Sequence, residues 1–173
     1  MRRKDRELSE YDALKIIDEC VYATLSCVDG DGVFALPISV ARGKGDLEKS
    51  VFIHGALNSS KDRLYRDGKE IVLVAVASAN VPILSQKELE NLKTNELGAK
   101  VFTTEYKSAI AITKAYKITK DCQKIAALRA LCEKYTPKYM ARFNEAATYD
   151  LAHTAIWELK IISISAKAKI IKS

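Results

Sequence analysis

The chain has 173 residues, of which 48% are hydrophobic, and carries a formal net charge of +6 at neutral pH. This length suits one domain spanning residues 1–173, and no apolar run approaches the roughly 20 residues that a membrane-spanning helix needs. The positive charge is mostly scattered lysine, without the interleaved aromatics of a nucleic-acid module, so an anionic small ligand explains the excess equally well.

Cysteine and histidine are sparse, with four and two residues respectively. The cysteines form no Cys-x-x-Cys pair, and the basic start of the chain has no apolar stretch behind it, so we expect neither disulfides nor a secretory signal. A cytoplasmic protein is the expectation. No local spacing of histidine and cysteine supports a metal site.

The first predicted element is a helix over residues 9–21, with Ser9 as its N-cap. An Asp-Gly-Asp-Gly turn at 29–32 then predicts a hairpin between two strands. Pro37, inside the second of these strands, favours an edge position or a bulge. Six segments have strand character: 22–28, 33–41, 51–54, 70–78, 106–118 and 154–169.

The strand 70–78 is apolar throughout, which is typical of a strand buried on both faces or lining a barrel. Residues 80–100 look like a helical surface insertion, because Ser85 and Glu88 form a capping-box pattern. Further helices are predicted over 121–135, capped by Asp121, and from Pro137 to about Asn144.

Antiparallel strands joined largely by hairpins, with helices around them, predict a mainly β protein with peripheral helices. The sheet is expected to be a six-stranded, closed or nearly closed barrel. From pattern alone, an open α+β sandwich is the alternative.

The most informative segment is 51–63, where a buried strand ends at His54 and a helix begins after small residues. A helix start presents unpaired N–H groups and a positive dipole end, and Lys61 adds a full charge. Asn58, Ser59 and Ser60 add side-chain donors. This arrangement suits a phosphate group, although ordinary helix capping explains the small polar residues as well.

Enzyme signatures are otherwise scarce. The chain has no Gly-x-Gly-x-x-Gly sequence, no phosphate-loop lysine motif and no Gly-x-Ser-x-Gly elbow. A protein so poor in catalytic side chains often takes its chemistry from a cofactor.

Four stretches, in this order, carry a family resemblance: 1–7, 35–40, 52–56 together with 59–61, and 106–110. Together they resemble the pyridoxamine 5′-phosphate oxidase-like flavoproteins, and most closely the nitroimidazole-reductase (Nim-type) branch. The resemblance implies a split β-barrel homodimer with FMN bound at the subunit interface.

The same resemblance implies which residues contact FMN. It places the flavin ring on the second strand, the ring edge at the end of the third strand, and the phosphate at the following helix start. A later polar residue would face the ring, and the single tryptophan matches more weakly, with core packing as its alternative role. The implied contacts are Leu36, Pro37, Ile38, Ser39, His54, Gly55, Ala56, Ser59, Ser60, Lys61, Ser108 and Trp157.

His54 is the one predicted catalytic residue, as a proton donor beside the flavin, against the alternative of a strand-end histidine bonded to backbone. No arginine follows Arg142, whereas true pyridoxamine phosphate oxidases hold their substrate with arginines near the C-terminus. The sequence therefore predicts an FMN-dependent reductase of a small substrate, possibly a nitroaromatic. A non-enzymatic flavin or haem binder is the alternative.

Overall fold

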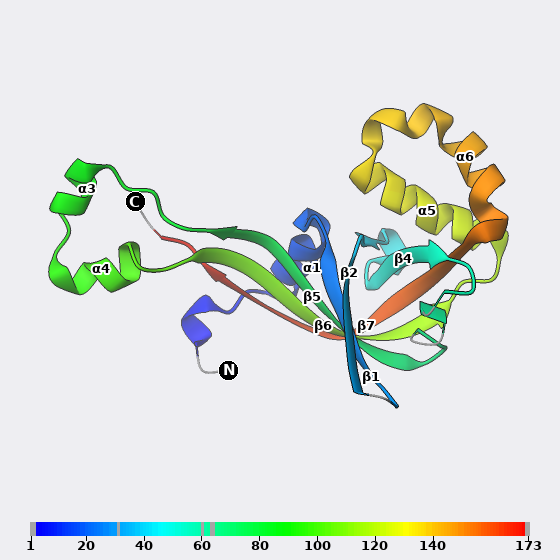
Figure 1. Ribbon diagram of the computed structural model, residues 1–173, viewed down its shortest axis with the longest axis horizontal. Helices are drawn as coiled ribbons and strands as arrows, with labels where there is room; N and C mark the ends of the chain where they lie inside the picture. Colours follow the sequence, from blue (N-terminus) through cyan, green and yellow to red (C-terminus); the bar gives the residue numbers. More distant parts are fainter. Residues whose placement is uncertain (1–2, 31, 60, 63–64, 172–173) are drawn as a thin grey trace.

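The computed structural model describes residues 3–30, 32–59, 61–62 and 65–171, and within them the chain forms one seven-stranded antiparallel sheet with peripheral helices (Figure 1). The strand order is β2-β1-β5-β6-β7-β4-β3. The strands are β1 (Ala23–Asp29), β2 (Gly32–Ile38), β3 (Ala41–Arg42), β4 (Ser50–Ala56), β5 (Lys69–Asn80), β6 (Glu105–Lys117) and β7 (Thr154–Lys169).

The helices surround this sheet, and none of those described is long and apolar enough to cross a membrane. The α-helices are α1 (Glu10–Glu19), α3 (Gln86–Glu90), α4 (Thr94–Lys100), α5 (Asp121–Tyr135) and α6 (Phe143–Asp150). Short 3-10 helices are η1 (Lys4–Arg6), η2 (Gly45–Leu47), η3 (Pro137–Arg142) and η4 (Leu151–His153).

One continuous stretch of chain closes the sheet into a barrel, and it accounts for the seventh strand. The prediction of a single strand over 33–41 is corrected here, because the stretch changes partner at Ser39 and Val40. Before this point β2 pairs with β1, and after it β3 pairs with β4 at the other edge of the sheet. Pro37 lies in the edge strand β2, as predicted, where a missing N–H costs no ladder bond on the free side.

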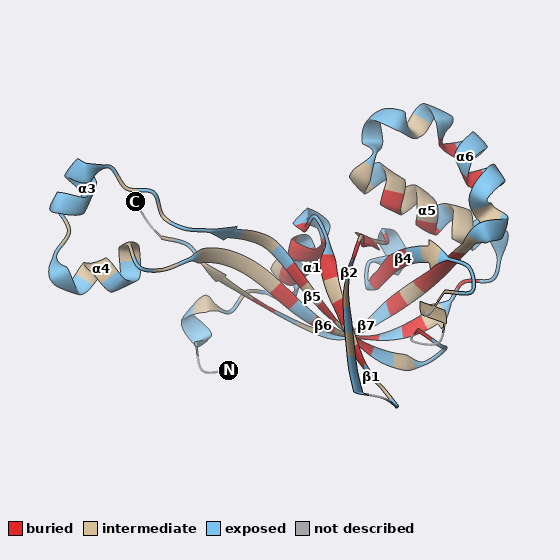
Figure 2. Cartoon of the chain, in the orientation of Figure 1, coloured by how far each residue is buried: buried red, intermediate tan, exposed pale blue. Residues whose placement is uncertain are grey.

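The barrel interior is filled by alternating residues of every long strand. A row of inward-facing residues crosses four strands, from Leu25 through Leu73 and Ala111 to Ile164. Helix α1 adds Ile16 and other apolar residues to this core, and a second cluster around Phe52 and Ile156 lies beneath α5 (Figure 2).

The helix ends test the capping predictions. Ser9 accepts a hydrogen bond from the Asp12 backbone N–H, and Ser85 forms the predicted capping box with Glu88. The prediction that Asp121 caps α5 is wrong, because Lys120 occupies the N-cap position and makes no side-chain cap. Asp121 is instead the first helical residue, where its carboxylate favours the positive end of the helix dipole. After α5 the chain forms η3 and then α6, so the short helix predicted from Pro137 begins as a 3-10 turn.

Strands β5, β6 and β7 run well beyond the barrel and carry α3 and α4 at their far end (Figure 1). We call residues 81–104, which connect β5 to β6, the arm. Helices α5 and α6 lie at the opposite end of the molecule, next to β4. Helices α3 and α4 contain no buried residue.

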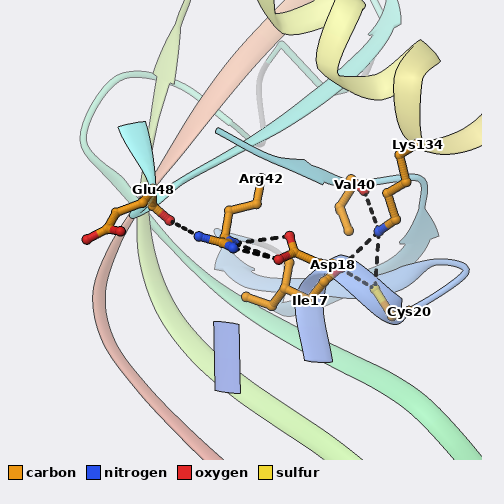
Figure 3. Close-up of polar contacts among 7 residues, drawn as sticks. All are labelled: Ile17, Asp18, Cys20, Val40, Arg42, Glu48 and Lys134. Carbon is orange, nitrogen blue, oxygen red and sulfur yellow. Dashed lines mark hydrogen bonds and ion pairs between the residues drawn. The ribbon is translucent and has the colours of Figure 1, made fainter. Parts of the chain in front are cut away.

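Two helices hold the strand that closes the barrel (Figure 3). The Lys134 ammonium of α5 donates to the Val40 carbonyl at 2.8 Å and to the Ile17 carbonyl of α1 at 2.9 Å. The Tyr135 hydroxyl binds both backbone groups of Val40, at 3.0 and 3.1 Å. Arg42 forms an ion pair with Asp18 of α1. These contacts satisfy backbone groups that the change of partner strand takes out of the ladder.

The Cys20 thiol lies 3.8 Å from the Lys134 ammonium and is completely buried. Burial raises the pKa of this thiol above its ordinary value, and the nearby ammonium only partly opposes the shift. Cys20 is therefore a protonated core residue at neutral pH.

We predict that Lys134→Met lowers the free energy of unfolding by about 1.5–3 kcal/mol, since it removes charge-assisted hydrogen bonds to two backbone carbonyls. Lys44→Met is the matched control. Lys44 is 87% exposed and pairs with Glu133 on the surface, where such a pair is worth about 0–1 kcal/mol. Urea unfolding of both variants measures the difference. Equal stability of the two variants would show that Lys134 does not hold the closing strand.

Candidate functional site

The barrel is split between β2 and the end of β4. The pairing of β3 with β4 includes Ala41 with Phe52 and Arg42 with Val51. The same register, continued, sets Ser39 opposite His54 and Pro37 opposite Ala56, but no ladder forms there among the described residues. The free edges of two strands therefore face each other, with backbone N–H and C=O groups available to a ligand.

On β2, the four predicted contacts alternate between two sides. Ile38 is buried in the core, and Leu36 packs against that core, so only their backbone groups are available at the split. Pro37 is exposed and Ser39 half-buried, and both belong to the outward-facing set of β2. The outer wall of the split on this side is thus a proline ring and a hydroxyl.

On β4, His54 and Ala56 are exposed, whereas Gly55 takes the inward position between them. A Cβ atom on Gly55 would lie 3.0 Å from Cδ and 3.2 Å from Nζ of Lys61. The Lys61 side chain therefore passes directly over Gly55, and the missing side chain makes room for it.

The turn after β4 is held by hydrogen bonds to and from the Asp62 region. Asn58 has a left-handed backbone with φ of 58°, a conformation that asparagine tolerates better than most residues. Its N–H donates to the Asp62 carboxylate at 2.9 Å, and the Asp62 N–H donates to the Ser59 carbonyl at 3.0 Å. Lys117 of β6 also pairs with Asp62.

A helical turn follows, where the sequence predicted a helix start. Lys61 and Asp62 have helical backbone, and the Tyr65 N–H donates to the Lys61 carbonyl at 2.8 Å. The predicted phosphate contact Ser60 lies outside the described residues.

Two polar groups at this turn have no partner within the described part of the chain. Among the described residues, the buried Ser59 hydroxyl makes no hydrogen bond and Lys61 makes no ion pair. A buried hydroxyl without a partner costs free energy. A hydroxyl and an ammonium, both free at one helical turn, are the donors that an anion requires.

His54 is electrostatically coupled to this turn. Although its side chain is exposed, surrounding protein atoms and then the charge of Lys61 lower its pKa below the ordinary 6.5. His54 is therefore predominantly neutral at pH 7. An anion bound beside Lys61 would oppose this effect and raise the pKa again.

Ser108 and Trp157 lie apart from the split. Ser108 is half-buried on β6, pairs with Val76, and shares an outward face with Ile110. Trp157 is fully buried in the barrel core, where its ring meets Tyr65 edge-on at a centroid distance of 5.7 Å. This placement favours the packing role of Trp157.

A separate apolar pocket of about 290 Å³ lies under α5, away from the predicted residues. Its charged rim is already paired, as in the contacts of Arg42 with Asp18 and of Lys44 with Glu133. None of the predicted contacts lines it, so we favour the split as the candidate site.

Sequence reasoning missed the residues that hold the strand closing the barrel, next to the split. Lys134 and Tyr135 are the last residues of α5, and nothing in the local sequence indicates that their polar groups bind the backbone of a distant strand. The sequence also did not predict that the Tyr65 hydroxyl and the Trp157 N–H are buried in the core without a partner among the described residues. Only the fold brings these two rings into contact.

The family model for pyridoxamine 5′-phosphate oxidase matches residues 9–168 of the chain. No curated protein matches it at the sequence level. Solved structures share its fold, and three of them are informative.

The flavocytochrome Anf3 from Azotobacter vinelandii superposes with a TM-score of 0.75 at 17% identity, covering 99% of this chain and 72% of that protein. An FAD- and haem-binding protein from Mycobacterium smegmatis gives 0.71 at 22% identity, covering 95% and 73%. A Bacteroides thetaiotaomicron protein provisionally assigned to 5-nitroimidazole antibiotic resistance gives 0.66 at 12% identity, covering 94% and 86%. At these identities the likeness establishes a shared split-barrel fold.

We predict that Lys61→Met raises the pKa of His54 toward 6.5 without reaching it, because burial, the larger cause of the shift, remains. An NMR titration of the imidazole measures this pKa in both proteins. Lys138→Met, at an exposed lysine of η3, is the charge-matched control. An unchanged midpoint in Lys61→Met would show that the ammonium does not act on His54.

Proposed function

The chain belongs to the pyridoxamine 5′-phosphate oxidase family, and we propose that it binds a flavin nucleotide, FMN, at the split between β2 and β4. The observation that carries this proposal is a pair of donors at one helical turn, the Lys61 ammonium and the buried Ser59 hydroxyl, which have no partner in the part of the chain that the structure describes. Two of the structural neighbours are flavin proteins by name, which supports a flavin.

The donor set fits a phosphate. FMN phosphate carries about two negative charges near neutral pH, and a lysine at a helix start supplies a full charge next to backbone N–H groups. Ser59 and Lys61 would hold this group, with Ser60 as a further expected donor. Gly55 keeps the path of the lysine open.

The strand edges at the split fit the flat, largely apolar ring. Pro37 offers an apolar surface, and the backbone groups of Leu36 and Ile38 offer hydrogen bonds to a polar ring edge. Ser39 and Ala56 would flank the ring on either side of the split. Ser108 lies apart from this split on the outward face of β6, so the contact expected for it would have to come from a second copy.

When bound, FMN would supply the electron transfer that no side chain of this chain provides. His54 would then donate the proton that the substrate takes up together with the electrons. Its imidazole is exposed at the outer rim of the split, and a bound phosphate next to Lys61 would bring its pKa back toward neutrality. The exposed position leaves His54 accessible to a substrate.

We infer that the reaction is the reduction of a small acceptor, with nitroaromatics as the specific candidates. The Nim-type resemblance and the Bacteroides neighbour support this class. Vitamin B6 oxidation is disfavoured, since no arginine follows Arg142 and Lys169 is occupied by a hydrogen bond to the Ala99 carbonyl.

A flavin or haem binder without turnover is the second candidate, favoured by the two neighbours that carry both cofactors by name. The absorption spectrum of the purified protein separates flavin from haem. Electron transfer from a reductant to an acceptor separates an enzyme from a storage or sensing protein.

We also propose that the protein is a homodimer. The sequence of β5 is that of a strand buried on both faces, yet in the single chain Val76 is 45% exposed and Ile110 beside it 48%. A second copy covering this face would bury these apolar side chains, as the sequence of β5 predicts.

The test of FMN binding is a titration of apo protein carrying Lys61→Ala. Loss of a charge-assisted contact should weaken FMN binding by roughly 1.5–3 kcal/mol, about ten- to a hundredfold. Riboflavin, which lacks the phosphate, should bind wild type and variant equally. Lys138→Ala controls for loss of a surface charge. Unchanged FMN affinity would remove Lys61 from the site.

We predict that His54→Ala retains FMN but reduces a nitroaromatic acceptor roughly 10²–10⁴ times more slowly, the usual contribution of a positioned proton donor. The measurement is acceptor reduction by flavin-loaded protein, with flavin content matched between wild type and variant. Equal rates would leave His54 with a structural role only, and would favour the non-enzymatic candidate.

A further inference from the structure

The apolar pocket under α5 is a second cavity of a size that suits a small molecule. Its volume of about 290 Å³ lies at the lower end of the range for ligand sites, roughly 300–1,000 Å³. Its floor is formed by Phe52 of β4 and by Ile118, which follows β6, and these side chains are only 6% and 8% exposed. Helix α5 forms the facing wall with Ala126 and Ala130, whose small side chains leave the space open.

The connection from β3 to β4 completes the pocket, and its position is fixed. The Gly43 N–H donates to the Ser50 carbonyl at 2.8 Å. A Cβ atom on Gly43 would lie 2.6 Å from the Cβ atom of Leu47, so the absence of a side chain allows η2 to fold back until Leu47 lines the pocket. Lys44 links the same connection to Glu133 of α5. The cavity is therefore formed before any ligand binds, which lowers the cost of binding.

One carboxylate lies in these apolar surroundings. Glu158 of β7 is half-buried, lines the pocket, and pairs across the sheet with Phe52 on one side and Tyr116 on the other. Its Oε1 atom accepts a hydrogen bond from the buried Ser50 hydroxyl at 2.5 Å, which orients the group. Within the described part of the chain, its other oxygen has no hydrogen-bond partner and the carboxylate makes no ion pair.

The basic groups around Glu158 are engaged elsewhere. Those that line the pocket contact other side chains: Arg42 binds Asp18 (Figure 3), Lys44 binds Glu133 and Arg129 binds Asn144. Lys160, two residues along β7, lies over the Tyr116 ring, 5.2 Å from its centroid. The pocket thus contains a negative charge that the described residues leave without a cation. In partly apolar surroundings such a charge is costly until it is paired.

We propose that this pocket binds a small organic cation, a compact apolar body that carries a primary or secondary ammonium group. The apolar body would lie on Phe52 and Ile118 beneath α5. The ammonium would donate to the free oxygen of Glu158, because a charge-assisted hydrogen bond is stronger than a neutral one and gains further in surroundings of low dielectric constant. This site is separate from the split and does not depend on a flavin.

Occupancy of the pocket would also act on the barrel. A bound cation would join α5 to β4 and β7, and α5 carries the Lys134 and Tyr135 groups that bind Val40 of the closing strand. A ligand that binds only the folded chain stabilises it by mass action. The unfolding temperature should therefore rise with the concentration of the amine.

Phenethylamine is the probe, because it carries one ammonium on a small aromatic body. Isothermal titration calorimetry of the purified protein compares it with 2-phenylethanol, which is neutral, and with 3-phenylpropionate, which has the opposite charge. Phenethylamine should bind at least ten times more tightly than either. Equal affinity for the amine and the alcohol, or no binding of the amine at millimolar concentration, would overturn the proposal. A preference for 3-phenylpropionate would also overturn it, and would assign the pocket to an organic anion.

The decisive variant is Glu158→Gln, which keeps the shape of the side chain and an acceptor for the Ser50 hydroxyl but removes the charge. It should weaken phenethylamine binding roughly ten- to a hundredfold and leave 2-phenylethanol binding unchanged. Glu145→Gln is the matched control, at an exposed carboxylate of α6 that pairs with Arg142. Equal effects of the two substitutions, or unchanged affinity in Glu158→Gln, would contradict a role for Glu158.

A second variant locates the site even if Glu158→Gln does not fold. Ala126→Leu adds a larger side chain to the α5 wall, and leucine is almost as favourable in a helix as alanine. It should abolish phenethylamine binding while thermal unfolding remains cooperative. Retained binding in this variant would place the amine elsewhere. Displacement of FMN by phenethylamine would place it at the split, and either result would overturn the proposal while leaving the flavin site intact.

Discussion

The structure depends on one strand that must serve two edges of the same sheet. Residues 32–42 pair with β1 and then with β4, and the change of partner takes Val40 out of any ladder. Unpaired backbone groups in a protein interior cost free energy comparable to a lost hydrogen bond. Lys134 and Tyr135 supply the missing partners, and Lys134 at the same time satisfies the last turn of α1. Closing the barrel therefore requires both helices.

The same crossing creates the candidate site. Because the strand cannot pair with β1 and β4 along its whole length, a split remains between β2 and the end of β4, and it is lined by free backbone edges. The turn that follows β4 then brings Ser59 and Lys61 to one end of the split, and Gly55 makes room for the lysine. An opening that is a topological necessity thus coincides with the strongest anion-binding signal in the chain.

Local patterns predicted what local forces determine. Strand β7 was predicted at 154–169 and the Ser9 cap at the right residue, because alternation and capping involve neighbours in sequence. The division of β2 from β3 was missed, since the change of partner depends on helix α5, where Tyr135 is 95 residues from Val40 in sequence. For the candidate site, the helix start was predictable, but not the free donors on Ser59 and Lys61. Whether a side chain has a partner is decided by tertiary contacts.

The two unsatisfied features of the single chain lie on one sheet. Free donors stand at the split, and an uncovered apolar face extends from Thr24 to Ser108, next to Pro37. A ligand that binds between them would contact both, so cofactor binding and association of two copies would be thermodynamically linked. Each would stabilise the other by the same coupling free energy, because linkage between binding equilibria is reciprocal. The affinity for FMN should then rise with protein concentration, and the dimer should tighten when FMN is present.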